Sequence, residues 1–130
     1  MIDILNDIKN ARTRKEKISI LQEHIDNGLL MLVLRMAYDR HHYVWPFKMN
    51  DIIKARSVML PEMGLIKAIA WMSESLPNCN DNAFAAEAMH SILISVEGEE
   101  RKILEGIIKG NLKLGISAAA LKQLLSSHWA

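Results

Sequence analysis

Apolar residues recur three or four positions apart through much of this 130-residue chain, which is the spacing of one buried face of an α-helix. The spacing runs through residues 2–9, 18–25, 65–72, 84–96 and 103–108. Stretches that alternate apolar and polar residues, as half-buried β-strands do, are few. The sequence therefore predicts an all-α fold, a single compact bundle of about seven helices that spans residues 1–130.

Residues that begin or end helices separate these stretches. Thr13 is followed three positions later by Glu16, which is the pattern of a capping box at a helix start. Further signals are Asp26 as the cap of a third helix, Pro61 at the first position of a later helix, Pro77 after its end, and Asn80 or Asp81 as the next cap. No helix signal stands out in residues 47–60, and their sequence does not decide their structure; an extended or irregular loop is one interpretation.

Helical periodicity also predicts which side chains form the core. The third helix is apolar on more than one side, so it should be the most buried one. Phe84, Ala88, Ile92 and Val96 share one face of a later helix. The residues expected between helices in the core are Leu32, Val33, Ile69, Ile92 and Ile107.

A tight elbow is predicted between the last two helices. Gly110 is placed to end one helix in the left-handed conformation, which costs residues with a Cβ atom more than it costs glycine. Ser117 is placed to start the next helix, since its hydroxyl can accept a hydrogen bond from a first-turn amide. The unpaired amides of such a helix start carry the positive end of the helix dipole.

The elbow has features of an anion site. Gly115 leaves the backbone bare for close approach, Lys109 and Lys113 add positive charge, and residues 106–130 contain no Asp or Glu. The candidate binding residues here are Lys109, Asn111, Lys113, Gly115 and Ser117. The alternative is a corner between packed helices without a ligand, which is what most glycine-containing elbows are.

A second basic cluster lies at the start of the predicted second helix. Residues 9–17 contain five basic side chains against one acid. Positive charges at a helix N-terminus oppose the dipole, at a cost of roughly a few tenths of a kcal/mol each, unless an anion is bound there. The candidates are Arg12, Arg14, Lys15 and Lys17, with a solvated charged turn as the alternative.

Three segments resemble the N-terminal DNA-binding domain of ATP-dependent DNA ligases, the phage-type (T-even-like) enzymes in particular. They are Gly-Asn-Leu-Lys-Leu-Gly-Ile-Ser-Ala-Ala-Ala-Leu-Lys-Gln-Leu from residue 110, Thr-Arg-Lys-Glu-Lys from residue 13, and Met-Ala-Tyr-Asp-Arg from residue 36 with the later Trp45-Pro46. The similarity covers residues 2–47 and about 97–125. It implies a domain that holds nicked duplex DNA through backbone phosphates and the minor groove, with little sequence preference.

The same resemblance indicates what the chain lacks. Such ligases form a covalent adenylate on the lysine of a Lys-x-Asp-Gly motif, and no lysine here is followed by x-Asp-Gly. We therefore expect no enzyme activity from this chain by itself and no cofactor in it. ATP and Mg would belong to catalytic ligase domains that act with it in cis or in trans.

Other chemistry has little support in the sequence. The five histidines are not spaced as metal ligands on a helix, no cysteine pair exists, and phosphate-binding glycine motifs are absent. The single Cys79 and the lack of a leader favour a cytoplasmic protein, and the longest apolar run is far short of the roughly 20 residues of a membrane span.

Charge leaves a rival function open. The net charge is only +1, and residues 74–105 contain seven acids against two basic residues. A helical protein–protein interaction module with no nucleic-acid role would use this acidic segment and the methionine-rich helices to bind a partner, while the basic clusters would be solvated.

Overall fold

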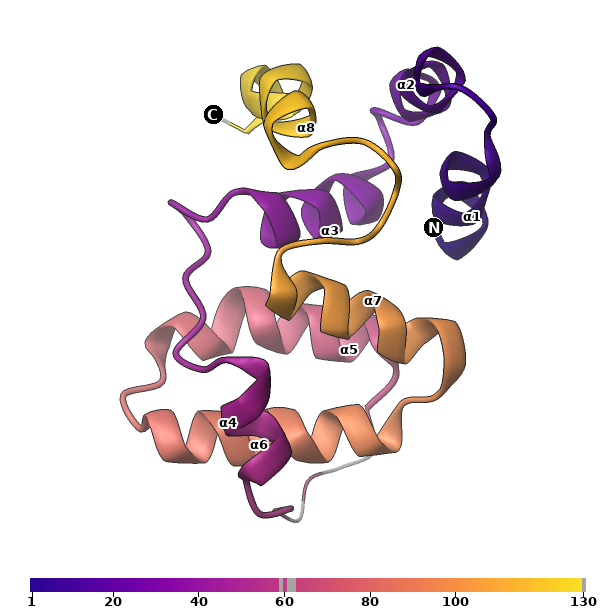
Figure 1. Cartoon of the computed structure of the whole chain (residues 1–130). Helices are drawn as coiled ribbons and strands as arrows, with labels where there is room; N and C mark the ends of the chain where they lie inside the picture. The colour runs from indigo at the N-terminus through magenta and orange to yellow at the C-terminus, as the bar shows by residue number, and fades with distance from the viewer. Residues whose placement is uncertain (59, 61–62, 130) are drawn as a thin grey trace.

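The computed structural model describes residues 1–58, 60 and 63–129. The described residues form eight α-helices and three short helical turns, with no strand among them, so the predicted all-α class is confirmed (Figure 1). In chain order the elements are α1 (Ile2–Asn10), α2 (Arg14–Glu23), α3 (Gly28–Tyr38), α4 (Met49–Lys54), α5 (Leu65–Ala70), a π-helical turn (Trp71–Ser75), a 3-10 turn (Leu76–Asn78), α6 (Asn82–Ser95), α7 (Gly98–Lys109), α8 (Ala118–Leu125) and a 3-10 turn (Ser126–His128).

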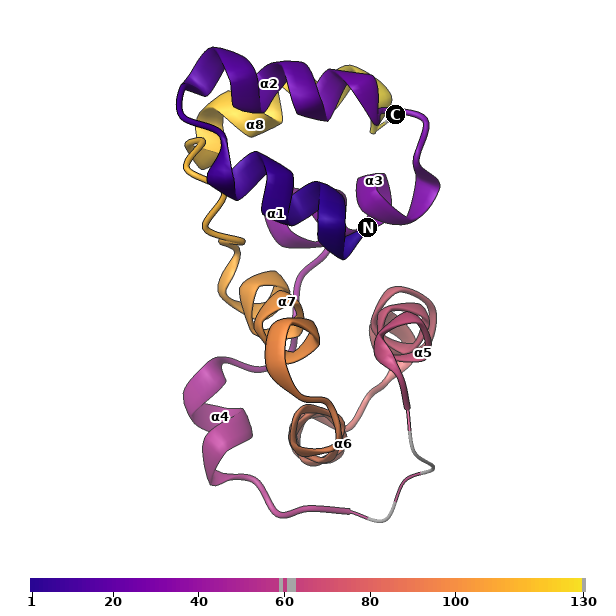
Figure 2. The same ribbon diagram turned by 90° about the vertical axis from the view of Figure 1, so that its right-hand side faces the viewer.

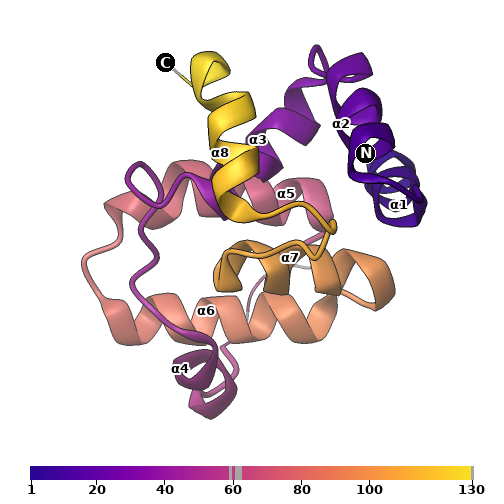
Figure 3. The ribbon, with the colours of Figure 1, turned by 45° about the horizontal axis from the view of Figure 1, so that its top comes forward.

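The helices gather in two groups joined through α7. Figure 2 shows α1, α2, α3 and α8 at one end of the molecule and α4, α5 and α6 toward the other, with α7 between them. The connection from α7 to α8 loops out toward α1 and α2 before it returns to α8 (Figures 1 and 3). This loop is the predicted elbow, and its path brings the last part of the chain close to the first.

Most of the side chains that the helical spacing predicts to be in the core are buried. Helix α3 is the most buried, with Leu30, Val33, Leu34, Met36 and Ala37 all fully inaccessible. Four of the five residues expected between helices are buried, namely Val33, Ile69, Ile92 and Ile107, while Leu32 is half-buried. Phe84 was wrongly assigned to the core stripe of α6, since it is 45% exposed in the first turn of that helix.

Side-chain caps begin most of the predicted helices. Thr13 accepts a hydrogen bond from the Glu16 amide, and Asp81 accepts one from the Phe84 amide, as predicted. The prediction that Asp26 caps α3 is wrong: Asn27 accepts from the Leu30 amide, because the helix begins one residue later than the pattern indicates.

The region around residues 47–60, whose structure the sequence left open, contains a short helix. Residues 49–54 form α4, and the Asp51 carboxylate accepts a hydrogen bond from the Lys48 amide at its start. A helix of six residues is too short to show a period in sequence, and Ile52, 1% exposed, packs it against α6. The prediction for Pro61 lies outside the described residues, and Pro77 falls within a 3-10 turn after α5.

Candidate nucleic-acid interface

Helix α7 ends at the elbow in the way that the sequence predicts. Gly110 has a left-handed backbone, with φ at 76°. The Asn111 amide donates to the Gly106 carbonyl (2.9 Å) and the Gly110 amide donates to the Ile107 carbonyl (3.3 Å). This pair of hydrogen bonds is the Schellman motif, which satisfies carbonyls that the end of a helix leaves unpaired. Gly106 also permits close packing, since a Cβ atom there would lie 2.8 Å from a Leu112 methyl carbon.

A buried tyrosine at the end of α3 fixes the first residues of the elbow. The Tyr38 hydroxyl, on a side chain only 2% exposed, accepts a hydrogen bond from the Leu112 amide at 2.9 Å. Burial raises the pKa of Tyr38 above its usual value of 10.0, and the hydrogen bond from Leu112 opposes part of that shift. The hydroxyl therefore stays neutral at physiological pH and remains an acceptor for this amide.

Two further side chains bind the carbonyls at the end of α7. The Arg40 guanidinium donates to the carbonyl oxygens of Ile107 (3.2 Å) and Ile108 (3.4 Å). The Trp45 indole N–H donates to the Ile107 carbonyl as well, at 3.3 Å. A cation at a helix C-terminus also stabilises the dipole. The segment from Tyr38 to Trp45 thus holds the end of α7 and the start of the elbow in place.

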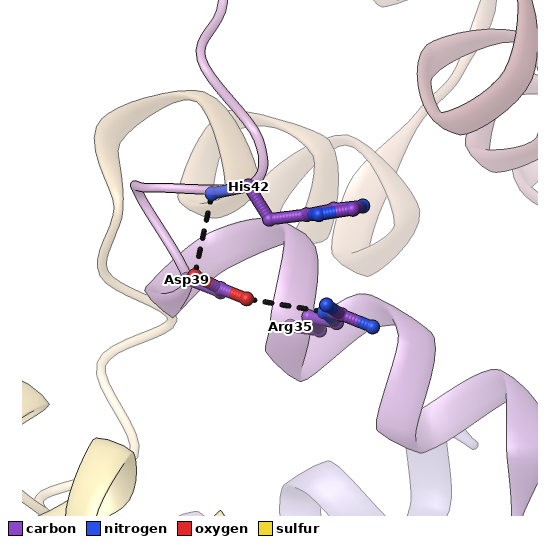
Figure 4. A network of polar contacts seen from close by, with 3 residues as sticks. All are labelled: Arg35, Asp39 and His42. Carbon is purple, nitrogen blue, oxygen red and sulfur yellow. Dashed lines mark hydrogen bonds and ion pairs between the residues drawn. The ribbon is translucent and has the colours of Figure 1, made fainter. Parts of the chain in front are cut away.

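A short polar network shapes the turn that carries Arg40. Figure 4 shows Asp39 between Arg35 and His42. The Arg35 Nε donates to one Asp39 carboxylate oxygen at 3.1 Å, and the His42 amide donates to the other at 3.4 Å. The Arg35–Asp39 contact is the only ion pair among the described residues, and it stabilises the turn that carries Arg40.

The tip of the elbow has a constrained backbone. Lys113 is a non-glycine residue with φ at 56°, and the Asn111 side-chain oxygen accepts a hydrogen bond from its amide at 2.8 Å. The left-handed conformation costs a residue with Cβ roughly 1–2 kcal/mol, which the Asn111 contact offsets in part. The Asn111 oxygen therefore helps to hold the Lys113 backbone in this conformation.

Lys17 joins the two predicted basic clusters in space. Its ammonium donates to the carbonyls of Ile8 (2.8 Å) and Lys9 (3.0 Å), so it caps the last turn of α1. The same side chain lies against Gly115, where a Cβ atom would be only 3.1 Å from its Cε and Nζ atoms. Gly115 also has φ at 80°, so glycine is required there for the backbone and for the approach of Lys17.

The other predicted residues occupy exposed positions around this junction. Ser117 accepts a hydrogen bond from the Ala120 amide and starts α8, as predicted. Arg12 donates its backbone amide to the Glu16 carboxylate. The exposed side chains of the two clusters are Arg12, Arg14, Lys15, Lys109, Asn111 and Lys113.

Four lysines from three parts of the chain line one hollow of about 410 Å³. Lys9 comes from the end of α1, Lys102 and Lys109 from one face of α7, and Lys113 from the elbow. Glu105 is the only carboxylate on the wall. Neither Lys9 nor Lys102 was among the predicted site residues, although Lys102 stands seven residues before Lys109 and so lies on the same helix face.

No protein-family model matches this sequence, and no curated protein matches it either.

In the described part of the chain, no group of three His, Cys, Asp or Glu side chains is placed to hold a metal ion. None of its helices is long and apolar enough to cross a bilayer.

Proposed function

We propose that this chain is the accessory DNA-binding domain of an ATP-dependent DNA ligase, and that it holds nicked duplex DNA through backbone phosphate and minor-groove contacts. The proposal joins the sequence resemblance to a surface of suitable charge. Lys-x-Asp-Gly does not occur in the chain, so nick sealing would need catalytic domains in cis or in trans, and ATP and Mg would act there.

The observation that carries the proposal is the junction of Lys17 with Gly115. Residues 12–17 and residues 109–117 are almost a chain length apart, yet the Lys17 side chain touches the elbow. The exposed cations of both clusters therefore lie around one junction between α2, the end of α1 and the elbow. A duplex presents phosphates along two strands, so an extended basic surface binds it better than one cluster does.

The same surface explains why little sequence preference is expected. Lysine and arginine contacts with phosphates position a protein on DNA but carry no sequence information. Sequence is read at base edges, whereas the contacts proposed here are made with phosphates. Binding should therefore be strong at low salt and similar for different sequences.

The rival function has an observation of its own. A largely apolar hollow of about 530 Å³ lies between α1, α3 and α5, and its lining includes Ile66, which is 67% exposed. The apolar lining residues are Met1, Ile2, Leu29, Leu65 and Ile66, and apolar residues gathered at the surface are typical of sites that bind other proteins. A helical protein-interaction module is therefore the second candidate.

The test is fluorescence anisotropy with nicked and intact duplexes over a range of salt concentrations. Lys113→Ala should weaken binding to all duplexes and flatten the log–log salt slope by roughly one unit, because one fewer phosphate is neutralised. Arg14→Ala should act in the same way. Lys54→Ala is the matched control, since α4 lies at the other end of the molecule and the change removes the same charge (Figure 2).

Two results would oppose the proposal. Affinity no better than micromolar at low salt, without salt dependence, would favour the protein-interaction module. Equal effects of the Lys113, Arg14 and Lys54 substitutions would show that general charge, and no particular surface, attracts the DNA.

A further inference from the structure

The lysine-lined hollow between α1 and α7 combines confinement with unbalanced charge. Four lysines and one glutamate are among the residues that line a space of about 410 Å³. None of these lysine side chains has a carboxylate within ion-pair distance among the described residues, whose one ion pair is Arg35 with Asp39. The positive charges therefore outnumber the negative charge of Glu105 on the wall, and solvent ions screen the excess.

The lysines are not needed for the backbone around them. The carbonyls at the end of α1 are bound by Lys17, and those at the end of α7 are bound by Arg40 and Trp45. The ammonium groups of the hollow are thus available to a ligand, and a bound anion would relieve their mutual repulsion.

The elbow holds one of these lysines in place at a cost in backbone energy. Lys113 keeps its left-handed conformation through the contact with Asn111, which is itself on the wall of the hollow. Strained backbone of this kind is found at ligand sites more often than elsewhere. The floor is formed by Gly106 and the buried Leu112, which offer no competing polar side chain.

We propose that this hollow is a binding site for a short oligophosphate chain of two or three phosphates. A phosphodiester carries a single negative charge, whereas a terminal phosphate carries about −1.5 to −2 near pH 7. A phosphate chain places several negative charges within a few ångströms, so it can contact all four lysines from inside the hollow. Duplex DNA is too wide to enter, and it would contact the rim only.

The neighbouring Glu99 limits where the phosphate chain of the ligand can lie. Lys9 and Lys102 also line a second hollow of about 220 Å³, which contains Glu99 and Asn6. The Asn6 amide donates to the Glu99 carboxylate at 3.2 Å, which keeps that negative charge at the far side of the two lysines. Phosphates are therefore repelled from the second hollow and directed toward Lys109 and Lys113.

Isothermal titration calorimetry with inorganic tripolyphosphate at low salt tests the proposal, with orthophosphate and sulfate at equal ionic strength as reference anions. Tripolyphosphate should bind at least about tenfold more tightly than orthophosphate, because it contacts more lysines at once. Lys102→Ala should weaken this binding about tenfold, and Lys113→Ala similarly. Lys54→Ala, on α4, should change it by less than about twofold.

Titration with a nucleoside triphosphate in the absence of magnesium shows whether the ligand is a free oligophosphate or the phosphate chain of a nucleotide. Equal affinity for tripolyphosphate and the nucleoside triphosphate identifies the phosphates alone as the ligand. Tighter binding of the nucleoside triphosphate, lost again in Lys102→Ala, identifies a nucleotide. The proposal is overturned if tripolyphosphate binds no better than sulfate, or if the Lys102 and Lys54 substitutions have equal effects while circular dichroism shows both variants folded.

The same titrations distinguish this site from the DNA-binding function. Binding of tripolyphosphate that depends on Lys102, without measurable binding of duplex DNA, would support the oligophosphate site and reject the DNA-binding proposal. Salt-dependent duplex binding without any binding of tripolyphosphate would support the DNA-binding proposal and reject the oligophosphate site.

Discussion

The hydrogen bond between Tyr38 and the elbow makes a sharp prediction about stability. Tyr38→Phe removes the only hydroxyl that accepts from the Leu112 amide, and both residues are buried, at 2% and 5% exposure. An unsatisfied buried donor costs about 1–3 kcal/mol, so the free energy of unfolding should fall by that amount. For a domain of this size the melting temperature should fall by roughly 4 °C for each kcal/mol.

The control for this change is Tyr43→Phe. Tyr43 is half-buried and stacks on Trp45, with ring centroids 5.7 Å apart, and phenylalanine keeps that ring. Its effect on the free energy of unfolding should stay within about 0.5 kcal/mol. Urea denaturation of the wild type and both variants measures the difference. Equal stability of the two variants would refute the role assigned to the Tyr38 hydroxyl.

The raised pKa of Tyr38 also predicts how the free energy of unfolding depends on pH. Its pKa in the folded protein lies above the unfolded value of 10.0, so the folded state retains the proton at a pH where the unfolded state has lost it. The stability that this group contributes is fully present below pH 10 and is lost as the pH rises through the raised pKa. Tyr38→Phe has no ionisable group at this position. The difference in the free energy of unfolding between the wild type and this variant should therefore shrink above pH 10.

Two other substitutions test local contacts. Asn27→Ala should lower the free energy of unfolding by about 1 kcal/mol, because α3 loses its cap. Asp26→Ala should leave the free energy of unfolding nearly unchanged. If urea denaturation shows the larger loss for Asp26→Ala, then Asp26 is the cap. Lys17→Met should speed hydrogen exchange in the last turn of α1, because two carbonyls lose their ammonium donor. Unchanged exchange there would mean that the Lys17 contacts add nothing to helix stability.

Much of the local structure could be predicted from the sequence, because its causes are local. The left-handed end of α7 needs a residue without Cβ, and Gly110 stands there; the start of α8 needs a hydroxyl acceptor, and Ser117 supplies it. The burial of α3 could be predicted because its sequence is apolar on more than one side. Local signals did not reveal the six-residue α4, and the cap predicted at Asp26 was wrong because its neighbour Asn27 carries the same signal.

The candidate site depends on contacts between residues distant in sequence, which a helical pattern does not specify. Nothing near Lys17 in the chain indicates that it reaches both the end of α1 and Gly115, and nothing near Lys9 indicates that it shares a hollow with Lys102 and Lys113. Sequence by itself determined most of the helices, several of their ends and the charges that they carry. The tertiary structure decided which charges meet, because that depends on how α1 and α2 pack beside the elbow, and packing is set by the whole core.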